Sequence, residues 1–403
     1  MVEQYVPSQE ILDKYADLLV RFALGSGKGI KKGEVVNIQV PECARPMLVC
    51  LRRAVLKAGG NPIMQLLPDG VTREFYEIAN EDQLNFFPGK LLKGRVDEMD
   101  HNIYIEATND LHELEGIDSK KVMEAHKPFK QYSEWRDEKE NAGKFTWTIA
   151  LYGTPEMAKE AGMSLKEYWE EIIKACYLDL DDPIKKWKEL FDETERLMKQ
   201  LDSLRIDKLR VIAKDTDLTV GIDKNRKWLG GSGRNIPSFE VFISPDWRKT
   251  EGKIRFTEKL YRYGNLIEDV YLEFKNGGVV VARAGKGEDV LKEMIKSDEG
   301  SKRVGEFSLT DKRMSRISKF MAETLFDENV GQPNGNCHIA LGKAYRDSYA
   351  GDIKKMKKED WDKIGFNDSV VHTDIVSTLD KKVIAYLEDG SEKVIYENGM
   401  FVI

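Results

Sequence analysis

The stretch EVVNIQVPECARPMLVCLRRAVLKAGGNPIMQLL, from Glu34 to Leu67, decides the fold of the first half of the chain. Its opening, Glu34 to Val40, is a β-rich run with an alternating pattern, and Arg45 to Lys57 has the spacing of a helix that ends before a pair of glycines. Asn61 to Leu67 then resembles a second strand. A strand, a helix and a strand in this order predict a βαβ unit, and therefore a parallel sheet with crossover helices.

The same pattern continues downstream of this unit. Apolar runs at Ile103 to Ile105 and at Phe145 to Tyr152 are flanked by helix-like segments, and we interpret both as further strands. The turn after the first strand is PECAR rather than G-x-G-x-x-G, so it lacks the glycines that let a backbone approach a pyrophosphate. The segment most similar to a glycine-rich phosphate-binding loop is GSGKG at Gly25 to Gly29, but it precedes a strand instead of following one. We therefore expect no dinucleotide or nucleoside triphosphate site.

Two helix starts mark the end of this first region. Ser164 with Glu167 three residues later forms a capping box, and Asp182 followed by Pro183 is an N-cap with proline at the first helical position. Apolar residues keep helical spacing from Ile184 onward for about six turns, which predicts one buried face. We place the domain boundary after this helix and expect an N-terminal domain over residues 1–208 and a C-terminal domain over residues 209–403.

The C-terminal domain is predicted to be richer in antiparallel sheet. Asn276-Gly277 lies between two β-rich runs and can adopt the positive φ values of a tight hairpin turn, and Asp389-Gly390 and Asn398-Gly399 repeat the device. The expected fold class is α/β. An N-terminal α/β domain with a largely parallel sheet precedes a C-terminal α+β domain, which contains every candidate metal-binding and catalytic residue named below.

Composition narrows the class of protein. The 403 residues are 41% hydrophobic and carry a formal net charge of -7, and no basic face is obvious, so nucleic acid is not an expected partner. The N-terminus is acidic where a signal peptide would be basic, and no run is apolar enough for a membrane span. We expect a cytoplasmic protein. The four cysteines form no C-x-x-C motif, and Cys337, although it precedes His338, is interpreted as a packing residue.

Chemistry concentrates between Phe326 and Asp374. His372 and Asp374 lie two apart in an apolar, β-branched run, so on a strand they project from one face and can bind a divalent metal; an aspartate that holds a histidine for structural reasons is the alternative. His338 and Tyr345 lie seven apart in HIALGKAY, which predicts a two-turn helix with both side chains on one face. Taken alone, that pair would more often belong to the core or the surface.

Two carboxylates upstream complete the candidate set. Glu240 and Glu306 each lie in an apolar segment where an unpaired charge would be costly, so each needs a cation or hydrogen-bond partners, although either one alone could be a surface residue. Glu328, within Asp327-Glu328-Asn329, is a further polar candidate that could help to recognise an α-amine or could simply cap or turn the chain.

The segments NIPSFEVF, GEFSL, LFDEN, CHIALGKAY and S-x-VHTD, in this order, resemble the thermophilic metallo-aminopeptidase family of the aminopeptidase T and aminopeptidase S type. The resemblance covers most of the chain and is strongest from Arg234 to Asp374. It implies a cytoplasmic, typically dimeric exopeptidase that acts on peptides with a free N-terminus and uses two divalent metal ions (zinc, cobalt or manganese). The metal ligands it implies are Glu240, Glu306, His338, Tyr345, His372 and Asp374.

Two departures from the family pattern affect the site. Phe239 precedes Glu240 where the family is expected to have a small glycine, which bears on the shape of the substrate pocket. The loop over residues 330–336 is longer and carries GQPNG, which bears on dimer contacts and on access to the site. Neither departure removes a ligand.

The resemblance implies hydrolysis by a hydroxide held at a two-metal site, in which a shared water is acidified. Glu306 is our choice for a bridging or base-like role, and Tyr345 could bind metal weakly or donate a hydrogen bond to the oxyanion. Two other classes stay open at this point. An iron-dependent ring-cleaving dioxygenase is distantly similar and could use His338, His372 and Asp374. A non-enzymatic protein with structural metals is the third, although structural zinc sites tend to be rich in cysteine.

Overall fold

The computed structural model describes residues 5–403, and contacts divide the chain into two compact units. Unit 1 runs to Phe191 and adds Gly231–Ser238 and Met321–Leu325; unit 2 is the remainder. The division falls inside two helices, α11 (Pro183–Ser203) and α13 (Thr324–Asp327). Contact density alone does not define an independently folding domain, so the boundary between residues 208 and 209 stays a prediction.

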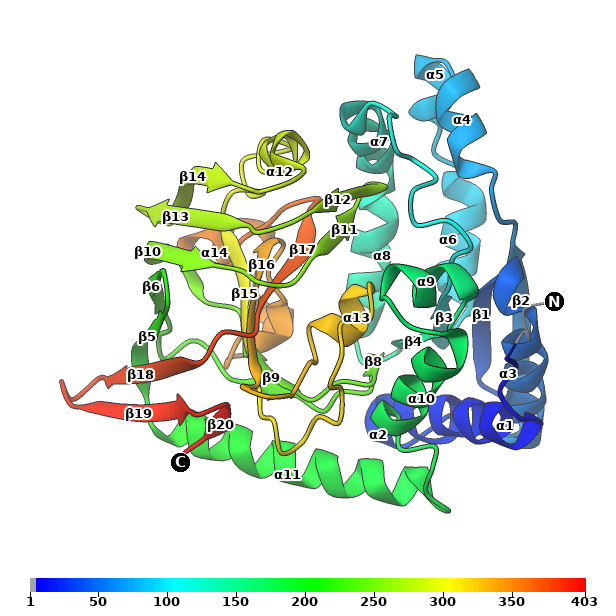
Figure 1. Cartoon of the computed structure of the whole chain (residues 1–403), viewed down its shortest axis with the longest axis horizontal. Helices are drawn as coiled ribbons and strands as arrows, with labels where there is room; N and C mark the ends of the chain where they lie inside the picture. Colours follow the sequence, from blue (N-terminus) through cyan, green and yellow to red (C-terminus); the bar gives the residue numbers. More distant parts are fainter. Residues whose placement is uncertain (1–4) are drawn as a thin grey trace. The chain divides into compact units, whose positions relative to one another are not determined.

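Unit 1 is built on a five-stranded parallel sheet in the order β2-β1-β3-β4-β8 (Figure 1). The predicted βαβ unit is confirmed, because β1 pairs in parallel with β2 on one side and β3 on the other, and α3 makes the crossover. The strands are β1 (Val35–Pro41), β2 (Asn61–Leu67), β3 (His101–Glu106), β4 (Thr146–Leu151) and β8 (Asn235–Ile236). The helices are α1 (Gln9–Leu18), α2 (Leu24–Gly27), α3 (Arg45–Lys57), α4 (Thr72–Ile78), α5 (Glu81–Leu84), α6 (Gly89–Glu98), α7 (Ser119–His126), α8 (Lys130–Asn141), α9 (Pro155–Glu160) and α10 (Leu165–Ala175).

The predicted helix starts are confirmed. The Ser164 side chain accepts from the Glu167 N–H, and the Glu167 side chain accepts from the Ser164 N–H, so both halves of the capping box are present at the start of α10. At the start of α11, the Asp182 carboxylate accepts from the Lys185 N–H at 2.9 Å. These bonds satisfy amide groups that a helix leaves without internal partners.

Unit 2 is dominated by antiparallel sheet, as predicted. An eight-stranded sheet runs in the order β14-β13-β10-β6-β5-β18-β19-β20, and the expected hairpin turn is confirmed, with φ of 50° at Asn276 and 80° at Gly277. Its strands are β5 (Ile206–Ala213), β6 (Thr216–Gly221), β10 (Asp246–Arg255), β13 (Tyr271–Lys275), β14 (Gly278–Arg283), β18 (Lys381–Leu387), β19 (Glu392–Glu397) and β20 (Met400–Phe401). Unit 2 also contains the short hairpin β11 (Leu260–Arg262) and β12 (Asn265–Ile267) and the helices α12 (Glu288–Met294) and α14 (Lys358–Lys363).

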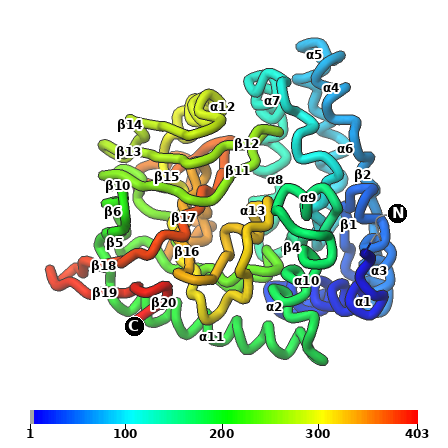
Figure 2. Tube along the Cα trace, viewed as in Figure 1, coloured from blue at the N-terminus to red at the C-terminus, as the bar shows by residue number. Residues whose placement is uncertain are grey.

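A second antiparallel sheet, which we call the site sheet, runs in the order β17-β16-β15-β9-β7. Figure 2 shows β15, β16 and β17 side by side although they are far apart in the sequence. Both β15 and β16 are buried at every residue. The strands are β7 (Leu229–Gly230), β9 (Glu240–Ile243), β15 (Val304–Thr310), β16 (Asn336–Gly342) and β17 (His372–Ser377).

The predicted helix from His338 to Tyr345 is wrong. His338 lies in strand β16, which ends at Gly342, and Tyr345 follows it in a loop. A short apolar run has no periodicity that separates a strand from a buried helix, and here pairing with β15 on one side and β17 on the other decides for the strand. Gly342 packs closely on the segment before β17, because a Cβ there would lie 2.0 Å from the Val371 carbonyl oxygen.

Lys381, in β18, is a buried cation with a testable cost. Its side chain is 4% exposed, and burial lowers the pKa of its ammonium group to about 8. The pKa of Lys381 is lower in the folded protein than in the unfolded chain, so below about pH 8 the buried charge destabilises the folded protein by roughly 3 kcal/mol. This destabilisation decreases as the pH rises toward about 10.5, because the folded protein loses the proton first. We expect Lys381→Met to raise the free energy of unfolding near pH 7 and to remove this rise in stability between pH 8 and 10, measured by denaturant unfolding.

Lys382→Met is the matched control, because Lys382 is the exposed neighbour on the same strand. It should keep the wild-type pH dependence. A Lys381→Met protein whose stability rises with pH as steeply as that of the wild type would contradict the prediction.

Residues 5–403 contain neither a membrane-spanning helix nor a disulfide bond. No helix in this range is long and apolar enough to cross a membrane. All four cysteines are unpaired, and Cys337 is buried, which raises the pKa of its thiol to about 11 and agrees with a packing role. The cytoplasmic location stays a prediction.

Candidate metal centre

The site sheet places five of the six predicted ligands on one face, and the sixth, Tyr345, lies in the loop after β16. Directly opposed residues of an antiparallel pair point to the same side, and the register sets Asp374 opposite Ala340 and Ala340 opposite Glu306. The small Ala340 therefore lies between two carboxylates. The remaining ligands follow the same alternation: His372 lies opposite Gly342, His338 opposite Ser308, and Glu240 opposite Thr310.

A bulge helps to aim Glu306. The register between β15 and β16 shifts between Val304 and Glu306, at Gly305. A Cβ on Gly305 would lie 2.4 Å from the carbonyl oxygens of both Gly342 and Lys343, so the close approach of the two strands requires glycine there. Bulges of this kind redirect the side chain that follows them.

The distances show that these side chains form one cluster. The His338 Nε2 lies 3.3 Å from a carboxylate oxygen of Glu240, 3.3 Å from one of Glu306 and 3.9 Å from one of Asp374. The His372 Nε2 lies 3.7 Å from Glu306 and 3.6 Å from Asp374. Three carboxylates and two imidazoles from four strands therefore converge on one small volume.

Burial makes this cluster electrostatically demanding. The pKa of Glu306 is raised to about 7, mainly by burial and also by the charges of Glu240 and Asp374, against the opposing effect of its hydrogen bond to His338. Burial alone would lower the pKa of His338, but its hydrogen bonds to Glu240 and Glu306 outweigh that effect and raise the pKa well above the usual value. An excess of buried negative charge of this kind needs a cation.

Polar contacts around the ligands fix their orientation. The His372 Nδ1 lies 2.8 Å from the Lys343 carbonyl, which can only accept, so Nδ1 carries the proton and Nε2 is free to face Glu306 and Asp374. The Tyr345 N–H donates to the Ser244 hydroxyl at 2.9 Å, and the Tyr345 ring lies 5.1 Å from the His372 ring, edge to face. Tyr345 therefore borders the cluster from the loop after β16.

Glu328, which the sequence suggested only as a possible contact for an α-amine, belongs to the cluster. Its side chain is 5% exposed and can place a carboxylate oxygen within 4.8 Å of ligand atoms of His338 and Asp374. Burial raises the pKa of Glu328 well above its usual value, and the charges of Glu240 and Asp374 add to the shift. The available sequence signal was the position of Glu328 between the apolar residues Phe326 and Val330. The burial of its neighbours is seen only in the structure.

Amide side chains hold the Glu328 segment against β16 and the start of β9. The Asn336 Nδ2 donates to the Glu328 carbonyl at 2.7 Å, and the Phe239 N–H donates to the Asn329 Oδ1 at 2.6 Å. Phe239 itself is 2% exposed and belongs to the core of unit 2. The bond to Asn329 therefore ties the residue directly before Glu240 to the residue directly after Glu328.

The donor set suits divalent metal ions. Three triplets of potential ligand atoms lie within 4.8 Å of one another: Glu240, Glu306 and His338; Glu306, His372 and Asp374; and Glu328, His338 and Asp374. Oxygen and imidazole nitrogen ligands on rigid strands match the preferences of zinc, cobalt and manganese, and the surplus negative charge calls for cations. A buried centre of this composition on a rigid sheet indicates a metal-binding protein.

Comparisons with known proteins identify the family. Residues 8–401 match the thermophilic metalloprotease (M29) family, and the chain belongs to it. It is 30% identical to aminopeptidase AmpS of Bacillus subtilis over 96% of this chain and 97% of that protein, and 29% identical to aminopeptidase T of Thermus thermophilus over 97% and 98%. The solved structure of wild-type AmpT from Thermus thermophilus matches with a TM-score of 0.83 at 26% identity, covering 98% of this chain and 100% of that one.

These matches confirm the predicted family and fold class. They make the chain a metal-dependent peptidase and therefore a hydrolase. The ring-cleaving dioxygenase alternative finds no support in them.

Proposed function

We propose that the chain releases N-terminal residues from peptides by attack of a metal-bound hydroxide at a centre of two divalent ions. Its family and its full-length relatives, which are named as aminopeptidases, make it a metallo-aminopeptidase. The observation that carries the two-metal proposal is the pair of ligand triplets that share Glu306, because one carboxylate common to two triplets is the arrangement that bridges two ions.

We assign the ligands as follows. One ion would be held by Glu240 and His338, the other by His372 and Asp374, and Glu306 would contribute to both. Divalent ions bound there would polarise the scissile carbonyl group and acidify a water molecule. Glu306 would hold both ions, and the Tyr345 hydroxyl would donate a hydrogen bond to the developing oxyanion. Glu328, within ligand distance of His338 and Asp374, is added to the predicted set as a further ligand.

The decisive experiment measures metal content beside hydrolysis of aminoacyl-p-nitroanilides with a free or a blocked α-amine. We expect about two zinc, cobalt or manganese ions per chain, cleavage only of the unblocked substrates, and loss of activity on chelation that returns when metal is added back. Equal cleavage of blocked substrates, or full activity after exhaustive chelation, would refute the proposal.

We also propose that the protein is a homodimer, as the family resemblance implies. An unpaired sheet edge in unit 1 supports self-association: β2 ends the parallel sheet, and Ile63, Met64 and Leu66 are 37%, 49% and 44% exposed. Asn61 donates its N–H toward β1, so alternation points the backbone groups of Met64 and Leu66 outward. Antiparallel pairing with the same strand of a second copy would satisfy these groups and bury the apolar side chains.

Light scattering after size exclusion tests this interface. We expect a dimer for the wild type and a monomer for Met64→Lys/Leu66→Lys, because each lysine would bring its charge into the paired edge. Val280→Lys, at a 58% exposed apolar position on β14, is the control and should leave the mass unchanged. A dimer that survives the double substitution would place the interface elsewhere.

A further inference from the structure

Arg262 lies beside the candidate metal centre. Its Nη2 donates to the His372 carbonyl oxygen at 3.0 Å. His372 opens β17, the edge strand of the site sheet, and the segment before β11 follows that edge, because the Thr257 and Glu258 N–H groups both donate to the Val376 carbonyl. Arg262 is thus held on the backbone of a proposed metal ligand.

The charge of Arg262 has no counter-ion in residues 5–403. No carboxylate in this range pairs with its guanidinium group, and its Nε is buried without a hydrogen-bond partner. The ring of Tyr263 lies 4.9 Å from the guanidinium carbon, which covers one face of the group but supplies no anion. A half-buried guanidinium group without a counter-ion is stabilised when a ligand supplies a carboxylate. The two carboxylate oxygens can accept two parallel hydrogen bonds from the planar guanidinium group.

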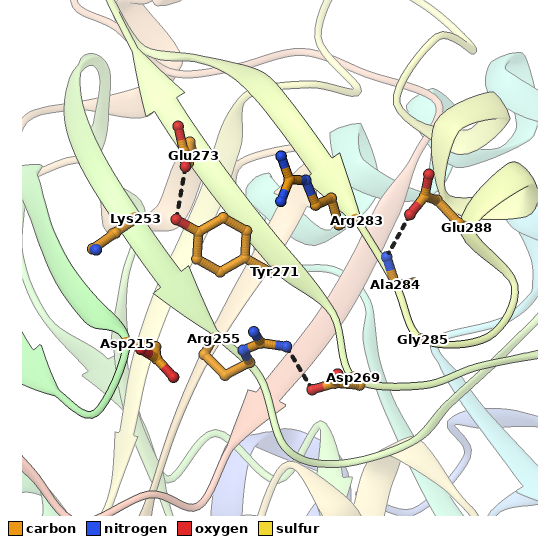
Figure 3. A pocket seen from close by; sticks show the side chains of 10 residues that line it. All are labelled: Asp215, Lys253, Arg255, Asp269, Tyr271, Glu273, Arg283, Ala284, Gly285 and Glu288. Carbon is orange, nitrogen blue, oxygen red and sulfur yellow. Dashed lines mark hydrogen bonds and ion pairs between the residues drawn. The ribbon is translucent and has the colours of Figure 1, made fainter.

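Arg255 provides the contrast within unit 2. It lines a cavity of about 470 Å³ whose lining carries three cationic and four carboxylate side chains (Figure 3). Arg255 pairs with Asp269 at 2.7 Å, the Tyr271 hydroxyl donates to Glu273 at 2.7 Å, and Glu288 accepts from the Ala284 N–H at 3.1 Å. Arg255 therefore already has a counter-ion, unlike Arg262.

We propose that Arg262 binds the C-terminal carboxylate of short peptide substrates and so selects di- and tripeptides. This inference rests on the proposed function, in which the scissile bond of the substrate lies at the metal centre. A peptide advances about 3.5 Å per residue, so a guanidinium group held on the backbone of His372 is within reach of a carboxylate one or two residues beyond that bond. Longer peptides would place an uncharged amide at this point and forgo the contact.

The test compares Leu-Gly with Leu-Gly-amide on the metal-loaded full chain. We expect the wild type to favour the free acid by at least about tenfold in kcat/KM, as a hydrogen-bonded charge pair implies. In Arg262→Met this preference should fall to near one, and Arg262→Lys should restore part of it. Arg255→Met, whose guanidinium group is already paired, is the matched control and should keep the wild-type preference.

Three results would overturn the inference. The first is a wild type that cleaves acid and amide equally, which needs no variant and so is informative even if Arg262→Met does not fold. The second is an Arg262→Met protein that loses both activities in proportion, which would make the residue a support for His372. The third is a strong preference for Glu-Gly-amide over Leu-Gly-amide that disappears in Arg262→Met, which would assign the contact to an acidic side chain. A metal-loaded wild type that cleaves no unblocked substrate would instead refute the aminopeptidase function itself.

Discussion

Replacing His338 with alanine is expected to lower kcat/KM for aminoacyl-p-nitroanilides at least about 1,000-fold, which corresponds to about 4 kcal/mol of transition-state stabilisation. The imidazole is fully buried, and its Nε2 lies within 4 Å of Glu240, Glu306 and Asp374. Removing it deletes a proposed metal ligand and leaves the carboxylates without the imidazole that lies among them. Bound metal, measured by mass spectrometry on the dialysed protein, should fall below the wild-type content.

His126→Ala is the matched control, because His126 is exposed at the end of α7. It should retain both activity and metal. Melting curves recorded with excess metal separate loss of the centre from loss of the fold. A His338→Ala protein with full activity, or one with reduced activity but an unchanged metal content, would contradict the ligand assignment.

Replacing Glu306 with glutamine is expected to change stability in opposite directions with and without metal. In chelator, the wild type confines Glu240, Glu306, Glu328 and Asp374 to one buried cluster, so removing one charge should raise the melting temperature. With metal present, the wild type gains about 4 kcal/mol at a thousandfold excess over the dissociation constant. The variant lacks the shared carboxylate and should lose most of that gain.

Differential scanning calorimetry in chelator and in added zinc, cobalt or manganese measures the melting temperature without metal and its increase when metal binds. Glu392→Gln, at an exposed position at the start of β19, controls for the loss of one charge and should behave as the wild type in both conditions. If Glu306→Gln melts below the wild type in chelator and gains as much from metal, the carboxylate cluster is not the metal centre.

Local signals in the sequence predicted much of the fold. The βαβ unit, the capping box at Ser164, the N-cap at Asp182 and the turn at Asn276-Gly277 all depend on residues within a few positions of one another. The helix assigned to His338–Tyr345 failed for the complementary reason: its strand conformation is imposed by β15 and β17, which lie at least 26 residues away in the sequence.

The sequence by itself determined which residue types could carry metal chemistry, because histidines and carboxylates in apolar runs need partners wherever they fold. Only the tertiary structure decided which of them meet. The strand register places Glu306 near both Glu240 with His338 and His372 with Asp374. The hydrogen bonds of Asn336 and Asn329 hold Glu328 at the cluster, and the hairpin β11–β12 places Arg262 beside His372. The bonds from Phe239 to Asn329 and from Arg262 to His372 join residues 90 and 110 apart, and over such separations sequence spacing carries no geometric information.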